Sequence, residues 1–325
     1  LVTTNSKKNV KMHHQFSGIK LKVDMKIIVV ANKTLSRNGQ NFFDASYFNF
    51  YIPLLELGHE VIFYDTIQGS NKCFDNIVNE FSPEVILCCL TGNPSVTPYE
   101  PIDEIEKITK EGKIKTINWF CDDTWRFDSF NKEICKKFTY CTTPEKKYLN
   151  KYKSIGYENI LLGSWHCNES FNLNSNKLIN VGFCGGLTES RASVFQFLQQ
   201  SGIDIKNFHG VSYEDVFRIY GSSKIVFNLT VNNNDPEKKR QMKLRIFEAV
   251  CSGSFLLTEY IDGIENLFKL DEEIVTFNTK EEALEKIIYY LENDLERESI
   301  AKLGYKRFLK DHTSKVRLNS ILNKI

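Results

Sequence analysis

The sequence predicts an α/β protein made of two doubly wound parallel sheets that face each other across a cleft. Strand and helix patterns alternate from Met25 to the end of the chain, and the alternation restarts once near residues 163–171. Parallel strands need long crossover connections, and the helices between them supply these connections. The length of 325 residues fits two domains at roughly 100–200 residues each.

The first half of the chain alternates six strands with four helices. Val85–Leu90 is apolar throughout, as expected of a strand buried on both faces. Gly58 ends the first helix as a C-cap. The expected strands are Met25–Val30, Glu60–Asp65, Val85–Leu90, Lys115–Cys121, Phe138–Cys141 and Ile160–Leu162. The expected helices are Phe42–Leu57, Asn71–Phe81, Ile102–Glu111 and Glu145–Ile155.

The second half repeats the alternation without an obvious sequence repeat. Its first strand ends in Gly185 and Gly186, and its last helices are charged and amphipathic. The expected strands are Ile179–Cys184, Asp204–Phe208, Ile225–Leu229, Phe255–Thr258 and Ile274–Phe277. The expected helices are Glu189–Ser201, Tyr213–Tyr220, Lys243–Cys251, Ile264–Phe268, Glu281–Asn293, Arg297–Lys310 and Ser314–Ile325.

The organisation predicted from this pattern has two domains and two terminal segments. Residues 1–24 are expected to be a disordered head or a segment that does not belong to the natural protein. The fold itself is expected to start at Met25. Residues 25–165 form the first domain, 166–310 the second, and 311–325 a C-terminal helix. The head holds five lysines and one aspartate, so the net charge of +1 conceals a head of +4 and a remainder of −3.

Composition narrows the class of protein. A balance of 42 basic and 41 acidic residues argues against a nucleic-acid polymer as partner. The odd count of nine cysteines, scattered through apolar segments, indicates buried thiols in a reducing compartment, so a cytoplasmic location is expected. No apolar run has the length of a signal peptide core or a transmembrane helix. The spacing of the cysteines also predicts no metal site.

Three charged residues mark the start of the helix expected at Lys243–Cys251. Lys243 and Arg245 lie where free backbone N–H groups already favour an anion, so they predict a diphosphate clamp. Glu248 lies more than a turn further in, where a carboxylate can accept hydrogen bonds from a ribose diol. The alternative is a surface helix with an incidental ion pair.

A second phosphate site is predicted after the strand Ile179–Cys184. Gly185 and Gly186 allow the backbone to approach a phosphate, and the next helix begins directly afterwards. Arg191 lies in the first turn of that helix, where a cation is unfavourable unless it faces an anion. The alternative is an ordinary glycine turn.

Paired carboxylates follow the strand Lys115–Cys121. Asp122 or Asp123 is the candidate general base for an acceptor hydroxyl, and the pattern does not decide between them. The alternative is a capping aspartate. Trp165 and His166 mark the change of domains and are candidates for a hinge or for contacts to a base, although a lone histidine is more often structural.

The segment from Gln241 to Thr258 resembles the donor-binding segment of GT-B glycosyltransferases of the group 1 type, and of the CgeB-like spore-protein subgroup in particular. The shared features are Arg245-Ile-Phe-Glu-Ala249, the following Gly253 and the apolar strand with Leu257-Thr258. The resemblance continues to Asp311-His-Thr313, covers residues 179–325 well, and is weaker over residues 25–165. Position 240, eight before Glu248, carries Arg240 where other GT-B families have a glutamate.

The resemblance implies a GT-B fold with two Rossmann-like domains. It implies a hexosyltransferase-like enzyme that moves a sugar from a UDP-sugar or GDP-sugar to an unknown hydroxyl, with no metal or other cofactor. The acceptor is expected to be a carbohydrate, a lipid-linked molecule or a protein. A nucleotide-sugar epimerase on the same fold and a non-catalytic glycan- or nucleotide-binding coat protein are the alternatives.

Overall fold

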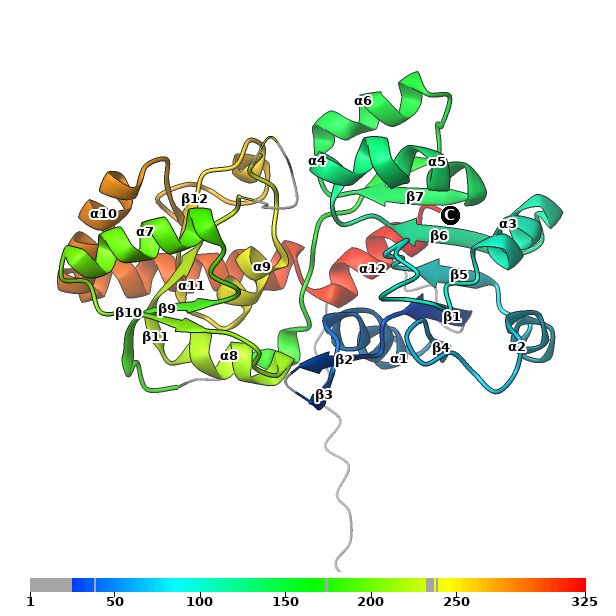
Figure 1. The fold of residues 1–325 in the computed structure, drawn as a ribbon, viewed down its shortest axis with the longest axis horizontal. Coiled ribbons are helices and arrows are strands. Elements are labelled where there is room, and N and C mark those ends of the chain that lie inside the picture. Colours follow the sequence, from blue (N-terminus) through cyan, green and yellow to red (C-terminus); the bar gives the residue numbers. More distant parts are fainter. Residues whose placement is uncertain (1–24, 38, 173–174, 232–236, 238) are drawn as a thin grey trace, which may run out of the picture.

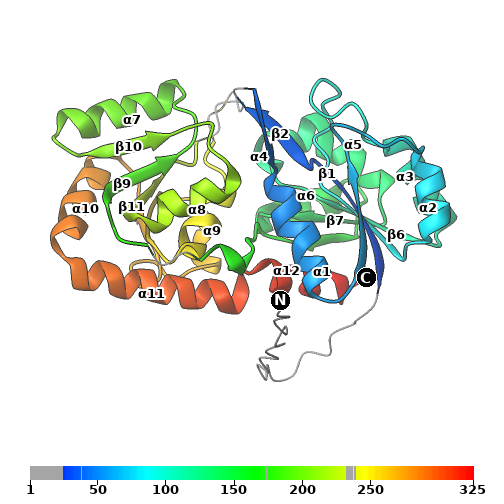
Figure 2. The ribbon, with the colours of Figure 1, turned by 90° about the horizontal axis from the view of Figure 1, so that it is seen from below.

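The chain folds into two lobes that lie side by side (Figure 1). The computed structural model describes residues 25–325 apart from 38, 173–174, 232–236 and 238, so the head expected at residues 1–24 lies outside the described residues. Each lobe is built around one parallel sheet with helices on both faces, as Figures 1 and 2 show. The predicted pair of doubly wound α/β domains is therefore confirmed.

The first lobe contains a six-stranded parallel sheet. Its strand order is β4 (Glu60–Asp65), β1 (Lys26–Ala31), β5 (Val85–Cys88), β6 (Lys115–Trp119), β7 (Tyr140–Thr143) and β8 (Ile160–Leu162). Alternate residues of β1 enter different cores, because successive side chains of a strand point to opposite faces. Ile28 and Val30 pack in the cluster that contains residues of α2 (Phe74–Phe81), α3 (Ile102–Glu111) and α6 (Lys146–Ser154).

The second lobe contains a five-stranded parallel sheet. Its order is β10 (Ile205–Phe208), β9 (Ile179–Cys184), β11 (Ser223–Asn228), β12 (Phe255–Glu259) and β13 (Val275–Phe277). One face packs in a cluster with α7 (Glu189–Gln200), α10 (Lys280–Glu292) and part of α11 (Asp294–Asp311). The other face packs with α8 (Tyr213–Gly221) and α9 (Leu244–Cys251).

The last helix returns to the first lobe. Helix α12 (Ser314–Leu322) follows α11 and lies below the sheet of the first lobe beside α1 (Ile52–Glu56), as Figure 2 shows. Its Leu318, Ile321 and Leu322 are buried with the Ile27 face of β1. The chain thus passes between the lobes twice, once before β9 and once before α12.

The two crossings lie against each other. Cys167 of the first crossing forms a parallel bridge with Thr313 of the second, and the backbone N–H of Ser314 donates to the carbonyl of Cys167 at 2.8 Å. The hydroxyl of Ser314 and Nδ1 of His166 are 2.9 Å apart. The connection between the lobes is therefore a paired and hydrogen-bonded segment.

The helix expected at Phe42–Leu57 is wrong in its first part. An antiparallel hairpin, β2 (Thr34–Arg37) and β3 (Gln40–Phe43), precedes it, and the helical turns begin at Tyr47. Gly39 adopts a φ of 77°, which the tight turn of a hairpin requires. The apolar spacing of the aromatic residues was compatible with a helix, but the Asn38-Gly39 pair is the stronger signal for a hairpin.

No disulfide joins any of the nine cysteines, all of which lie in the described part of the chain. Among the described residues, no helix is both long enough and apolar enough to cross a membrane.

The return of α12 predicts a stability contrast between two leucines near the C-terminus. Leu318 is 1% exposed in the core of the first lobe, whereas Leu309 of α11 is 43% exposed. Leu318→Ala removes buried methyl groups and should lower the free energy of unfolding by about 2–5 kcal/mol. Leu309→Ala should change it by less than about 0.5 kcal/mol. Urea unfolding measures both, and equal losses would contradict the packing of α12.

Candidate functional site

The predicted donor-binding residues lie where the second sheet changes its winding direction. Strands β9 and β11 are neighbours, but the chain leaves β9 toward β10 on one side and leaves β11 toward β12 on the other. Ligands of open α/β sheets bind beyond the carboxyl ends of strands at this switch point. Gly185 and Gly186 follow β9 here, and the loop after β11 leads to α9.

A cavity of about 380 Å³ lies at this point and is lined by both lobes. Five of the six predicted donor residues line it, namely Gly185, Gly186, Arg191, Arg245 and Glu248. Cys184, residues 208–211, Tyr213, Val216 and Leu244 complete the wall on the second lobe. The first lobe contributes Leu35 and residues 42–45, which belong to the hairpin and the turn after it. The sixth predicted residue, Lys243, precedes α9 as its N-cap.

Gly185 leaves room for the side chain of Arg245 against this wall. A Cβ atom there would lie 2.6 Å from Nη1 of Arg245, which is closer than non-bonded atoms approach. Nη1 of Arg245 also lies 3.3 Å from the carbonyl oxygen of Cys184, to which it donates. The glycine therefore allows the guanidinium to lie directly over the backbone at the end of β9.

The cations of the site are held by neutral groups. Arg191 donates to the carbonyl of Gly186 at 3.0 Å and to that of Val231 at 3.2 Å. The guanidinium of Arg245 lies 5.3 Å from the ring centre of Phe183. Within the described parts of the chain, no carboxylate forms an ion pair with Arg191, Lys243 or Arg245. Three positive charges thus converge without a direct ion pair, and carboxylates act on them from further away, Glu259 on Arg191 and Asp122 and Glu145 on Lys243.

Burial and the repulsion between these cations lower the pKa values of Arg191 and Lys243. Burial, with the nearby Arg245 adding to it, lowers the pKa of Arg191 to about 10. Burial lowers the pKa of Lys243 to about 8, which Asp122 opposes and Arg245 and Arg191 reinforce. A bound anion would relieve both effects, because it compensates the charge that burial and repulsion disfavour.

Glu248 lies on α9 and is buried, with 5% of its surface exposed, while it lines the cavity. Helix α9 begins at Leu244, so Lys243 and Arg245 lie at its positive end and Glu248 lies about one turn inside. The structure thus places Lys243 and Arg245 at the start of α9 and Glu248 further along the same helix, in the order that the sequence predicted.

The two aspartates after β6 have different surroundings. Asp123 is fully buried and accepts hydrogen bonds from Asn131 at 2.9 Å and from the hydroxyls of Thr143 and Tyr152 at 2.5 Å each. Burial raises its pKa, and these three donors oppose the rise. Asp123 thus joins α4 (Asp123–Arg126) to β7 and α6, and these contacts favour a structural role.

Asp122 is only partly buried and faces the second lobe, where the side-chain amide of Gln241 donates to its Oδ1. It also influences the pKa of Lys243, so it lies near the cations of the donor cavity. Of the two carboxylates, Asp122 is the one that the structure presents to the space between the lobes.

Trp165 and His166 lie in the first crossing between the lobes, and neither lines the cavity. His166 is buried and lies edge-on to Phe50 and Trp119, with ring centres 4.8 and 4.9 Å away. Burial, with the charge of Arg317 adding to it, lowers the pKa of His166 to about 3, so the ring is neutral. Its contacts are those of a packed residue in the connection between the lobes.

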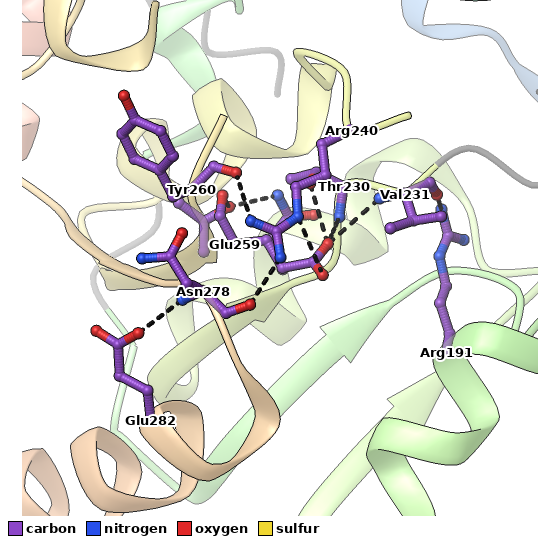
Figure 3. Close-up of polar contacts among 10 residues, drawn as sticks. Arg191, Thr230, Val231, Arg240, Glu259, Tyr260, Asn278 and Glu282 are labelled. Atoms are coloured by element: carbon purple, nitrogen blue, oxygen red, sulfur yellow. Dashed lines mark hydrogen bonds and ion pairs between the residues drawn. The ribbon is translucent and has the colours of Figure 1, made fainter. Parts of the chain in front are cut away.

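Sequence reasoning missed a carboxylate at the end of β12. Glu259 is buried and accepts from the N–H of Thr230 at 2.5 Å and from that of Val231 at 3.3 Å (Figure 3). Arg240 lies 3.8 Å from it and donates to the carbonyls of Tyr260 and Asn278. Its position directly after an apolar strand was the signal, because polar residues at carboxyl ends of strands line such sites.

The comparisons with known proteins agree with this geometry. The family model described as glycosyl transferase-like matches residues 191–323. A glycosyltransferase from Rickettsia africae has a TM-score of 0.61 at 11% identity, over 93% of this chain and 97% of its own. Sucrose-phosphate synthase from Thermosynechococcus elongatus has 0.62 at 9%, over 92% and 98%.

A third similar structure contains UDP-glucose. The Anabaena protein HepE in complex with UDP-glucose has a TM-score of 0.59 at 10% identity, over 93% of this chain and 100% of its own. No curated protein matches the sequence significantly. The GT-B fold and the resemblance to GT-B glycosyltransferases of the group 1 type are thus confirmed, while the predicted roles of individual residues stay predictions.

The contrast between the paired aspartates is measurable as stability. Asp123→Ala leaves three buried donors without an acceptor and should lower the free energy of unfolding by about 3 kcal/mol or more. Asp122→Ala, at a partly exposed position, should cost about 1 kcal/mol or less. Chemical denaturation of both variants checks this, and a stable Asp123→Ala protein would return Asp123 to the list of catalytic candidates.

The lowered pKa of Lys243 predicts a pH dependence of anion binding. A bound diphosphate stabilises the ammonium form, which is mostly present at pH 7 and mostly absent at pH 9 when the pKa is about 8. The affinity for UDP should therefore fall about tenfold from pH 7 to pH 9. Isothermal titration calorimetry measures this dependence.

Two variants at the same position serve as controls for that titration. Lys243→Arg keeps its charge over this range and should flatten the profile, because arginine stays protonated. Lys243→Met should bind weakly at both pH values. A tenfold fall that persists in Lys243→Met would assign the titration to another group.

Proposed function

We propose that this GT-B chain, whose C-terminal half matches the glycosyl transferase-like family, is a glycosyltransferase that uses a nucleotide-diphosphate sugar. The observation that carries the proposal is the cavity at the switch point, which Arg191 and Arg245 line and near which Lys243 lies, with the burial of Arg191 and Lys243 lowering the pKa of both. A diphosphate is the anion whose charge and length suit such a group of cations.

In this proposal each predicted donor residue has one task. Gly185 and Gly186 let the diphosphate approach the backbone, and Arg191, Lys243 and Arg245 hold its oxygens. Glu248 accepts hydrogen bonds from the ribose hydroxyls. The cations stabilise the negative charge that develops on the leaving diphosphate as the bond to the anomeric carbon breaks, so we propose that the reaction needs no metal or other cofactor.

The acceptor enters from the first lobe. Asp122 is the proposed general base, because its carboxylate faces the second lobe near Lys243. Phe42 and Phe43 line the cavity, so the hairpin would cover the bound donor. A covered donor is shielded from water that would otherwise hydrolyse it. The proposed acceptor is a hydroxyl of a carbohydrate, a lipid-linked molecule or a protein, and the donor is a UDP-sugar or a GDP-sugar.

Turnover separates this proposal from the alternatives. Release of UDP or GDP that depends on an added acceptor supports transfer. Isomerisation of the sugar without an acceptor would support an epimerase, and binding without turnover across a broad acceptor panel would support a coat protein. A thermal-shift screen of UDP, GDP, dTDP, ADP and CMP chooses the nucleotide for these assays, and no response to any of them would contradict the donor site.

Glu248→Gln tests the ribose contact while it conserves the volume of a buried side chain. Loss of the charged acceptor should weaken nucleoside diphosphate binding by about 10–100-fold, the range for a hydrogen bond to a charged group. Glu285→Gln, at an exposed position of α10, should bind like the wild type. Calorimetry with UDP or GDP compares the three proteins. Equal affinity for wild type and Glu248→Gln would remove Glu248 from the site.

A further inference from the structure

Gln241 connects the two lobes through its side chain. The residue is 2% exposed, and its backbone N–H donates to the carbonyl of Thr230 within the second lobe at 3.3 Å. Its side-chain amide instead contacts the first lobe. Oε1 accepts from the hydroxyl of Thr124 at 2.7 Å, and Nε2 donates to Oδ1 of Asp122. These two hydrogen bonds join residues that are more than a hundred positions apart.

The chemistry of the two partners fixes the orientation of this amide. An ionised carboxylate can only accept, so the NH₂ end of Gln241 must face Asp122. The hydroxyl of Thr124 can donate, and it satisfies the carbonyl end. A flipped amide would place two acceptors together at Asp122. The arrangement therefore holds one carboxylate oxygen of Asp122 and leaves Oδ2 available for another partner.

The backbone around Asp122 is fixed from the other side. Asp123, the next residue, is held by its three buried donors, and Asp122 is the N-cap residue of α4. The main chain at this point therefore has little freedom, and the orientation of the Asp122 carboxylate depends on its side-chain contacts. Gln241 supplies the direct hydrogen bond from the second lobe.

Gln241 is also close to the donor cavity along the chain. It precedes Lys243, the N-cap residue of α9, by two positions, and the intervening Met242 is buried in the core of the second lobe. Helix α9 carries Arg245 and Glu248. A contact that holds Lys243 and the start of α9 in place would therefore also restrict the backbone of Gln241, whose side chain donates to Asp122.

We infer that Gln241 is a positioning residue for Asp122, which couples the occupancy of the donor cavity in one lobe to the orientation of the candidate base in the other. The inference rests on the proposed function, because it assigns the donor to the second lobe and the base to the first. Arg240 stands eight residues before Glu248, where other GT-B families have a glutamate, and the resemblance assigns no role to the next residue, Gln241.

Hydrogen exchange with UDP as the probe tests the coupling without relying on turnover. UDP should slow amide exchange about threefold or more in residues 122–131 of the wild-type first lobe, because the Gln241 contact tightens when the start of α9 is held. Gln241→Leu should bind UDP with an affinity within about twofold of wild type but lose this protection. Gln200→Leu, an exposed site on α7, is the matched control and should keep it.

The outcomes distinguish the inference from the proposed function. If the wild-type protein binds neither UDP nor GDP, the proposed donor site is wrong and the inference fails with it. Binding that gives wild type and Gln241→Leu the same exchange pattern would overturn the inference alone. Loss of UDP affinity in Gln241→Leu would also overturn it, because the residue would then belong to the donor site.

A double-mutant cycle in the transfer assay gives the second readout. Gln241→Leu should lower kcat about tenfold or more with the donor KM nearly unchanged, since it acts on the base and not on the donor. In an Asp122→Asn background the same substitution should have almost no further effect, because the group on which it acts is already lost. Losses that multiply would show that Gln241 acts independently of Asp122.

Discussion

The proposed function depends on three cationic side chains that converge near one cavity and form no ion pair with the described residues. Arg191 and Arg245 are tied to backbone carbonyls at the end of β9, and Lys243 is the N-cap residue of α9, where its side chain makes no capping hydrogen bond. The fall of the Lys243 pKa from 10.5 to about 8 corresponds to roughly 3 kcal/mol. A diphosphate bound there, as we propose, would recover much of this free energy, because it compensates the charge that burial disfavours.

The first lobe supplies the complementary chemistry. Its paired aspartates divide their tasks, since Asp123 fixes the loop in the core and leaves Asp122 to face the second lobe. The double crossing of the chain, bridged between Cys167 and Thr313, holds the lobes in register while α12 anchors the second lobe to the core of the first. The proposed donor residues and Asp122 therefore lie near a junction to which both lobes contribute.

The sequence predicted the parallel strands well, because a short, continuous apolar segment between two helices is typical of a strand that is buried on both faces. It also placed five of the six predicted donor residues around one cavity. It could not decide between Asp122 and Asp123, because the choice depends on Thr143 and Tyr152, which are distant in the chain. Gln241 was missed because its contacts join the two lobes, and local periodicity carries no record of them. The hairpin did have a local signal, the Asn38-Gly39 pair, but the helical spacing of the aromatic residues was given more weight.

The central claim is that the convergent cations bind a diphosphate, and the affinity of the wild-type protein for a nucleoside diphosphate compared with its nucleoside tests it most directly. Calorimetry at two salt concentrations should give one site for UDP or GDP. The corresponding nucleoside should bind about a hundredfold more weakly or worse, and only the diphosphate should lose affinity as salt increases. Equal affinity for nucleotide and nucleoside, or binding that salt does not change, would contradict the account.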